Sequence, residues 1–251
     1  MRDEANAQRR SGRTQAIQSL RRVVRLFRNK TKPHYPRPHR WRRLGDDDVW
    51  NLVLGQVSVV GSAASGERLL SSRTAMRALR YRRLLRLGAA ARTREIHRLL
   101  RAHGVRYVTL EPAKCAKTRA LVRNLALLEE FPGGPSGYIR RLATLPSEED
   151  RIARVSKDLA FIKLKGSRDF LAEVGLATDV IAFDVRVLGI LRALGLKLAP
   201  NTTSSRKSYE QLQAMLLREV CAPEGVTGVV LDRILFWNAA EIHRAIERGA
   251  L

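Results

Sequence analysis

Lys165 and Asp184 are the two side chains of this sequence whose type and position could do chemistry. Lysine is scarce, with 9 lysines against 38 arginines, and Lys165 stands at the exit of a short turn between two helix-like stretches. An uncharged lysine amine is a nucleophile that can form covalent intermediates. Asp184 follows 19 residues later, directly before an apolar run, so its simplest interpretation is a helix N-cap. An amine and a carboxylate at this spacing are the candidate reactive pair.

Residues 151–195 contain the elements that must position this pair. Their pattern predicts two short helices joined by a tight hairpin, then a loop and a third helix that begins at Asp184. Gly175 is a suitable stop for the second helix, because a glycine just past the last turn can adopt the left-handed conformation. The dipole and the free N–H groups of a helix N-terminus favour a negatively charged side chain at Asp184. The segment thus predicts a lysine near the start of the second helix and an aspartate at the start of the third.

The formal net charge of +23 is the strongest signal of the composition. It exceeds what solubility needs and favours a polyanionic partner, with nucleic acid as the first candidate. An anionic membrane surface would also attract the chain, but no run approaches the roughly 20 apolar residues that span a bilayer. With 45 % apolar residues in 251, the chain can build an ordinary buried core. We therefore expect a globular, monomeric protein that binds nucleic acid and does not span a membrane.

The cysteines and histidines do not form a metal-binding or disulfide pattern. Cys115 and Cys221 lie far apart, which excludes a disulfide framework and a four-cysteine zinc or iron–sulfur site. The five histidines include no pair at i, i+4 and no cysteine at metal-site spacing. Cys115 is predicted to be a small buried residue, since no constellation for a thiol nucleophile accompanies it. We expect no metal and no cofactor, and a reducing compartment such as the cytoplasm or nucleoid.

Residues 1–45 are predicted to be a basic, flexible and disordered arm. The first 43 residues contain 14 Lys or Arg against two acidic residues, and such a run raises DNA affinity without specificity. A mitochondrial presequence and a start codon assigned too far upstream are alternative interpretations. A helix over Ser11–Lys32 is also possible, because four apolar residues could line one of its faces: Ile17, Leu20, Val24 and Phe27.

Residues 46–251 are predicted to form one helical domain. Asp46–Asp48 supply a capping cluster ahead of an apolar, helix-periodic run. Only Val105–Leu110 alternates like a strand, and it is short enough to be an extended connection. Outside the segment described above, further helices are expected at about 66–86, 92–103, 113–130, 135–143, 207–220 and 225–247. The expected fold class is all-α.

The segment 151–195 resembles the helix-hairpin-helix DNA glycosylase superfamily. Members with a catalytic lysine place it at the end of the hairpin and place an aspartate about this far downstream, capping the next helix. The closer resemblance is to the small second type of 8-oxoguanine DNA glycosylase and AP lyase. In that type the hairpin leads into a lysine, two small or polar residues, Phe-Leu and a glycine, and later an aliphatic-Asp-Arg-aliphatic helix start. The matching residues are Lys165, Phe170, Leu171, Gly175, Ile181, Ala182, Asp184, Arg186, Val187 and Leu188.

Two flanking stretches extend the resemblance over roughly residues 46–251. Asp48–Ser62 resembles the first domain helix of the superfamily, where a glutamine lies near the DNA, which implies Gln56 as a further base-binding residue. Leu231–Trp237 resembles the C-terminal helix of the small type, whose tryptophan stacks on the extruded base. The resemblance implies Trp237 as the base-stacking residue with Phe236 second, although both could instead be core residues of an amphipathic helix.

The resemblance implies the excision of a damaged base from double-stranded DNA. Lys165 would attack C1′ of the damaged nucleoside, displace the base and form a Schiff base, and β-elimination of the 3′ phosphate would follow. Nearby positive charge and an apolar hairpin would help to keep the amine uncharged. Asp184 would stabilise the oxocarbenium character of the sugar and help to move protons. Phosphate contacts would come from the hairpin amides and from basic side chains: Lys163, Arg168, Arg186, Arg119 and Arg123.

Two departures from the family pattern leave alternatives open. The family hairpin has two glycines that approach a phosphate and coordinate a monovalent cation, whereas residues 161–164 are Phe-Ile-Lys-Leu, so cation binding is in doubt. The chain also continues for 14 residues after Trp237, where the small type ends shortly after its tryptophan. One alternative is a non-catalytic helix-hairpin-helix module or architectural protein that binds DNA by charge. Another is a monofunctional glycosylase for alkylated bases that uses Asp184 and water.

Overall fold

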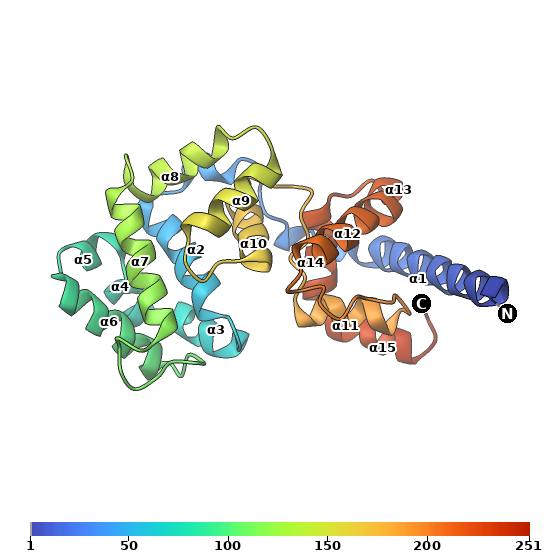
Figure 1. The fold of residues 1–251 in the computed structure, drawn as a ribbon, viewed down its shortest axis with the longest axis horizontal. Helices are drawn as coiled ribbons and strands as arrows, with labels where there is room; N and C mark the ends of the chain where they lie inside the picture. Colours follow the sequence, from blue (N-terminus) through green and yellow to red (C-terminus); the bar gives the residue numbers. More distant parts are fainter. Residues whose placement is uncertain (1) are drawn as a thin grey trace. The chain divides into compact units, whose positions relative to one another are not determined.

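The computed structural model describes the backbone of residues 2–251 and the side chains from Gly12 onward. All regular elements within this range are helical, so the predicted all-α class is confirmed (Figure 1). The stretch 105–110, which alternates like a strand in sequence, forms turns and an irregular connection. No helix of the described chain is both long enough and apolar enough to cross a bilayer.

The chain divides into two compact units, where the sequence predicted one domain over residues 46–251. We call Pro38–Leu176 the hairpin unit, because it contains the predicted helix-hairpin-helix. Met1–Arg37 and Ala177–Leu251 together form the second, which we call the terminal unit. Lys165 therefore belongs to the hairpin unit and Asp184 to the terminal unit.

The hairpin unit is built around α2 (Asp46–Ser58), whose buried face includes Trp50 and Leu54. The indole of Trp50 donates a hydrogen bond to the carbonyl of Leu79 at 2.8 Å. Helix α2 packs against α3, α7, α8 and α10. The other elements of this unit are η2 (Arg40–Arg43), α3 (Ala63–Ser71), α4 (Arg73–Ala78), α5 (Tyr81–Leu85), α6 (Ala89–Ala102), α7 (Ala116–Glu130), α8 (Gly134–Ala143), α9 (Glu148–Asp158) and α10 (Leu164–Val174).

The first turn of α2 ties distant parts of the hairpin unit together. Asp47 Oδ1 accepts a hydrogen bond from the amide of Tyr81 at 2.7 Å, and Asp46 Oδ1 accepts one from Ser136 Oγ at 2.8 Å. The single helix predicted at 66–86 is instead three short helices. Ser72 begins the second of these, because its hydroxyl accepts a hydrogen bond from Ala75 N at 3.3 Å. A local N-cap interrupts the helix there despite the apolar periodicity.

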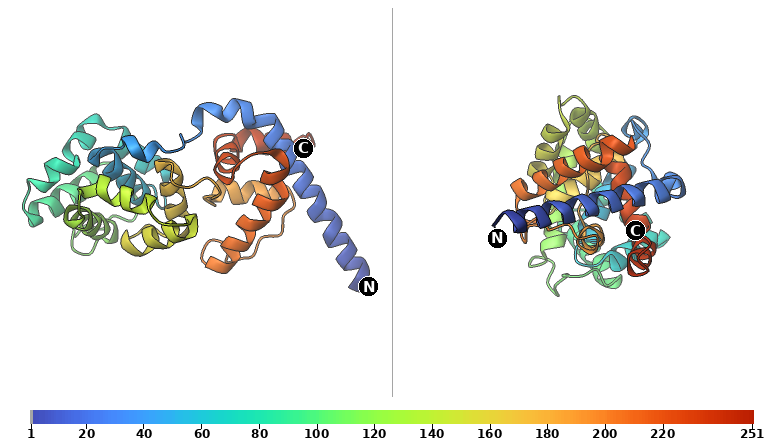
Figure 2. Two further views of the ribbon diagram at one scale, coloured as in Figure 1. Left: turned by 90° about the horizontal axis from the view of Figure 1, so that it is seen from above. Right: turned by 90° about the vertical axis from the view of Figure 1, so that its right-hand side faces the viewer.

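The prediction of a disordered arm over residues 1–45 is wrong for the described chain, because residues 2–31 form the helix α1 (Arg2–Thr31). Helix α1 packs against α14, η3 and α13 of the terminal unit. Figure 2 shows α1 running across these elements, with its first turns extending beyond them. Its inward face is apolar and buried: Ala16, Ile17, Leu20, Val23, Val24 and Phe27. Burial of this apolar stripe offsets the conformational entropy that is lost when the segment becomes a helix. The basic residues alone would not provide that stabilisation.

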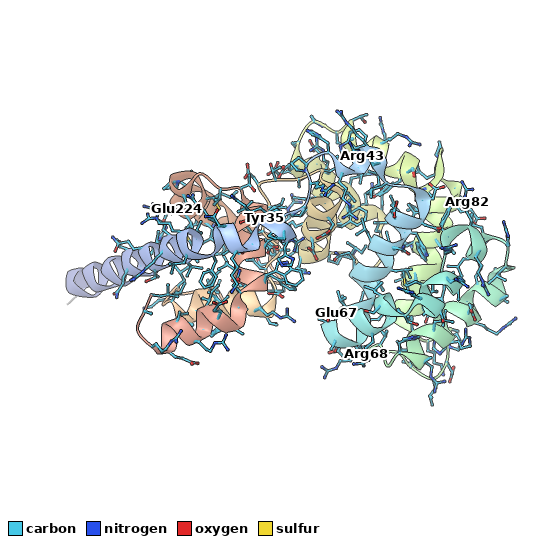
Figure 3. The ribbon with its side chains drawn as sticks, turned by 180° about the vertical axis from the view of Figure 1, so that it is seen from behind. Tyr35, Arg43, Glu67, Arg68, Arg82 and Glu224 are labelled. Atoms are coloured by element: carbon cyan, nitrogen blue, oxygen red, sulfur yellow. The ribbon has the colours of Figure 1, made fainter. Side chains whose placement is uncertain are left out.

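Ion pairs to acidic residues far along the chain reinforce the packing of α1. Arg25 forms a bidentate pair with Glu224, at 2.6 and 2.8 Å, and Glu224 lies beside α1 in Figure 3. Arg13 pairs with Glu219 at 2.5 Å, and Lys30 pairs with Glu241. These carboxylates neutralise part of the positive charge that made the segment resemble a disordered arm.

The rest of the terminal unit follows the predicted helices with two breaks. The predicted helix 207–220 becomes α12 followed directly by a short π-helix, and the predicted helix 225–247 is divided at Asn238. The elements are η1 (Lys32–His34), α11 (Val185–Ala193), α12 (Arg206–Leu216), η3 (Leu217–Cys221), α13 (Ala222–Glu224), α14 (Gly228–Trp237) and α15 (Ala239–Glu247).

Candidate active site

A tight hairpin between α9 and α10 positions Lys165. Phe161 lies in the left-handed region with φ = 70°, a conformation that glycine adopts at much lower cost. Asn124 of α7 holds the turn, because its Nδ2 donates to the carbonyl of Ala160 at 3.0 Å and its Oδ1 accepts from the Ala160 amide at 2.6 Å. The loop therefore keeps the hairpin geometry without either of the glycines that the family pattern contains.

Lys165 lies in the first turn of α10, directly after the hairpin. Its Nζ is 2.8 Å from Asp169 Oδ2, and the side chains of Lys165 and Asp169 are 35 % and 16 % exposed. The same carboxylate oxygen accepts a hydrogen bond from Gln56 Nε2 of α2 at 3.1 Å. Gly166 follows Lys165, and a Cβ there would lie 3.2 Å from Ile162 of the hairpin, a close contact that glycine avoids. The structure thus brings Lys165 and Gln56 together around one carboxylate.

Asp169 is a residue that the sequence analysis missed. An acid four residues after a lysine on a predicted helix is a pair that helix geometry brings together, so the signal was present in the sequence. The partly exposed amine of Lys165 therefore faces a carboxylate. This group can accept a hydrogen bond from the amine or accept its proton.

Asp184 is the N-cap of α11, as the sequence predicted. Its Oδ1 accepts hydrogen bonds from the amides of Arg186 at 3.0 Å and Val187 at 2.9 Å. Among the residues whose side chains are described, none donates a hydrogen bond to Oδ2. The helix cap therefore fixes the carboxylate through backbone groups and leaves one oxygen for another partner.

The predicted base-binding aromatics lie at the end of α14. Trp237 is 53 % exposed and Phe236 is half-buried. Their rings meet edge to face, with centroids 5.5 Å apart and an interplanar angle of 83°. The guanidinium of Arg186 lies over the Phe236 ring, 4.7 Å from its centroid. More than half of Trp237 is exposed, so it is not a core residue, and that alternative interpretation does not hold for it.

The predicted phosphate contacts fall into two groups. Arg119 and Arg123 are exposed on α7, and Lys163 is exposed at the hairpin, where its Nζ donates to the carbonyl of Ser156 at 3.0 Å. Arg168 is different, because only 2 % of it is exposed. Its guanidinium donates to the carbonyl of Leu164 at 2.9 Å inside the first turn of α10. Assigning Arg168 to DNA phosphate was therefore wrong: it lies in the protein interior.

The candidate residues are divided between the two units. Lys165, Gln56, Lys163, Arg119 and Arg123 belong to the hairpin unit. The terminal unit holds the other candidates: Asp184, Arg186, Phe236 and Trp237. The pairing of Lys165 with Asp184 across a nucleotide stays a prediction of the sequence.

Two other titratable groups lie in the core of the hairpin unit. Lys117 is fully buried, and desolvation lowers its pKa to about 8. Cys115 is buried, as predicted, and its sulfur accepts a hydrogen bond from the Thr118 amide at 3.4 Å. Within the described residues no three His, Cys, Asp or Glu side chains are arranged to hold a metal ion.

Comparison of the sequence with family models finds no match, and none of the curated proteins matches it either. Solved structures do match. An 8-oxoguanine DNA glycosylase of Methanocaldococcus jannaschii aligns with a TM-score of 0.64 and 15 % identity, over 89 % of this chain and 92 % of that one. The 8-oxoguanine DNA glycosylase of Thermotoga maritima aligns with a TM-score of 0.63 and 19 % identity, over 88 % of this chain and 94 % of that one.

A third structure is the Methanocaldococcus jannaschii 8-oxoguanine glycosylase/lyase in complex with a 15mer DNA that contains 8-oxoguanine. It aligns with a TM-score of 0.64 and 15 % identity, over 90 % of this chain and 98 % of that one. The matches span nearly the whole length of both partners. At these identities they establish a common fold.

Proposed function

Because the chain has the helix-hairpin-helix fold of the 8-oxoguanine DNA glycosylases, we propose that it is a base-excision DNA glycosylase that removes an oxidised purine, 8-oxoguanine, and cleaves the resulting abasic site. The observation that carries the proposal is the position of Lys165. Its amine is partly exposed in the first turn after the hairpin, in a chain with this fold. Fold alone does not determine function, so the side chains must supply the evidence for this activity.

In the proposed reaction the uncharged amine of Lys165 attacks C1′ of the damaged nucleoside. The bond from C1′ to the base breaks, and the base leaves with the electron pair and takes up a proton. Opening of the sugar ring then gives the Schiff base. Loss of a C2′ proton expels the 3′ phosphate and cuts the strand. Asp169 is suited to accept the amine proton, because its carboxylate lies 2.8 Å from Nζ.

Asp184 would stabilise the positive charge that develops on the sugar, since a preorganised carboxylate acts most strongly where charge appears in the transition state. Trp237 would supply a stacking surface for the extruded base. Flipping a base costs a few kcal/mol, and an aromatic ring offers replacement stacking. The exposed side chains of Lys163, Arg119 and Arg123 would contact phosphates, which position the protein on the duplex without reading its sequence.

Borohydride trapping on a duplex with a single 8-oxoguanine tests the lysine chemistry. We expect a covalent adduct with the wild-type chain and none with Lys165→Gln. Lys163→Gln is the matched control, because this neighbouring lysine is exposed and is assigned only a phosphate contact. It should weaken DNA binding and keep the adduct. If no lesion in a panel of duplexes yields base release, the chain is a DNA binder and not a glycosylase.

Base release without an adduct would instead select a monofunctional glycosylase, in which Asp184 activates water. One observation favours this second candidate, because the Asp169 carboxylate beside Nζ stabilises the protonated amine. Asp184→Asn bears on both mechanisms. Asparagine caps helices as well as aspartate does, so we expect unchanged stability but base release lower by roughly 100-fold or more.

A further inference from the structure

The indole of Trp237 is stacked on the imidazole of His34, a residue that neither the sequence analysis nor the proposed reaction uses. The two ring centroids are 4.1 Å apart and the rings are inclined by 18°. His34 ends the short helix η1, directly after α1. Parallel stacking at this distance covers one face of the indole, while 53 % of Trp237 stays exposed.

A buried hydrogen bond fixes the segment that carries His34. Asn238 follows Trp237, and its Nδ2 donates to Thr31 Oγ1 at 2.9 Å and to the carbonyl of Ile234 at 2.9 Å. Thr31 and Asn238 are 1 % and 6 % exposed. The end of α1 is therefore joined to the end of α14 within one unit, three residues before His34 and one residue after Trp237.

The residue on the other side of His34 is also held. Tyr35 Oη donates to the carbonyl of Arg28 at 2.6 Å, so the chain folds back onto the last turns of α1. Figure 3 shows Tyr35 at this end of α1. The chain on both sides of His34 is therefore anchored, and its exposed imidazole lies against one face of the indole.

From this geometry we infer that His34 is a positioning residue for base recognition, which holds the Trp237 indole in the orientation that stacks on an extruded purine. The inference rests on the proposed function. The end of the basic N-terminal segment would then contribute to substrate binding through His34, in addition to any attraction between its positive charge and DNA. The stack would then be imidazole, indole and base, with the indole sandwiched between two flat partners. Rotation of the indole out of this plane would cost base affinity without changing the bond-breaking step.

Steady-state base release from a lesion-containing duplex tests the inference. His34→Asn removes the ring, and we expect KM to rise roughly two- to tenfold, the range for one aromatic pair, with kcat unchanged. His34→Phe keeps a flat ring and should restore KM. His39→Asn is the matched control, since His39 is an exposed histidine of the hairpin unit, and it should leave KM unchanged. Thermal unfolding of each variant reports whether the fold is kept.

A double-substitution cycle shows whether His34 acts through Trp237. In a Trp237→Ala background His34→Asn should have no further effect on KM. An additive effect, or an unchanged KM in His34→Asn alone, would overturn the role of His34 while base release by the wild-type chain still stands. Absence of base release by the wild-type chain would overturn the proposed function and the inference together.

Discussion

Lys117 and Lys165 lie in the same unit of the protein but are held in different ways. The amine of Lys117 is fully buried and donates to two backbone carbonyls at the carboxyl end of α2, those of Ser58 at 3.1 Å and Val60 at 2.7 Å. The amine of Lys165 is partly exposed and faces the carboxylate of Asp169.

The difference teaches that a lowered pKa does not by itself mark a reactive lysine. Burial lowers the pKa of Lys117 to about 8, a value that a nucleophilic amine would need. Its hydrogen bonds cap the negative end of a helix dipole instead. Lys165 lacks that degree of burial, but it is accessible and stands where the hairpin ends. Accessibility and position separate the candidate catalytic lysine from the structural one.

The largest expected effect is on covalent trapping. Lys117→Met should give the wild-type yield of borohydride adduct under conditions in which Lys165→Gln gives none. An adduct that survives in Lys165→Gln and disappears in a folded Lys117→Met protein would reverse the assignment of the two lysines.

The second effect is on the pH dependence of stability. Because the pKa of Lys117 is lowered to about 8 from its usual 10.5, the unfolded chain binds more protons than the folded chain between these values. The free energy of unfolding should therefore rise with pH from 8 to 10.5, by at most about 3 kcal/mol, and should lack this contribution below pH 8. Urea unfolding at several pH values measures it, and the difference between wild type and Lys117→Met isolates this one group. Parallel curves for the two proteins would contradict it.

A smaller effect tests the partner of Lys165. Asp169→Asn removes the proposed proton acceptor, and we expect the single-turnover rate of base release to fall roughly tenfold or more. Gln56→Ala leaves the carboxylate and its contact with Nζ in place, so at enzyme concentrations that saturate DNA binding it should cost less. Quench-flow measurement with excess enzyme gives both rates. An equal loss in the two variants would mean that the network acts as a unit and that the carboxylate has no separate role.

The smallest effect concerns the hairpin that leads to Lys165. Phe161→Gly and Phe161→Ala remove the same aromatic ring, but only glycine relieves the left-handed backbone at φ = 70°. The glycine variant should therefore be more stable than the alanine variant by about 1 kcal/mol, as measured by chemical denaturation. Equal stabilities would show that the backbone conformation stores no strain.

The sequence predicted the features that depend on local signals. Asp184 as a helix cap, Gly175 as a left-handed helix end with φ = 74°, and the hairpin before Lys165 were all predicted correctly. Each depends on a few neighbouring residues whose chemistry is specific. The apolar periodicity of 66–86 does not reveal its division into three helices, because one break depends on Ser72 as a local N-cap.

Features that depend on distant residues could not be predicted. For α1 the sequence left both disorder and a helix over Ser11–Lys32 open, and the helix is confirmed. The charge favoured disorder because the acidic partners, such as Glu219 and Glu224, lie about 200 residues further along the chain. The burial of Arg168 and the stacking of His34 on Trp237 also arise only when elements pack together. Charge composition is therefore a poor guide to order when the compensating carboxylates are remote in sequence.

The terminal unit is assembled from two separated stretches of chain, with the whole hairpin unit between them. During synthesis α1 leaves the ribosome before the hairpin unit, yet the helix against which its apolar stripe packs, α14, is made only after the hairpin unit is complete. The apolar face of α1 therefore stays exposed to water or bound to a chaperone until α14 is made. The hairpin unit can fold in the meantime, because its residues are contiguous. The terminal unit, which carries Asp184 and Trp237, is consequently completed only after the hairpin unit.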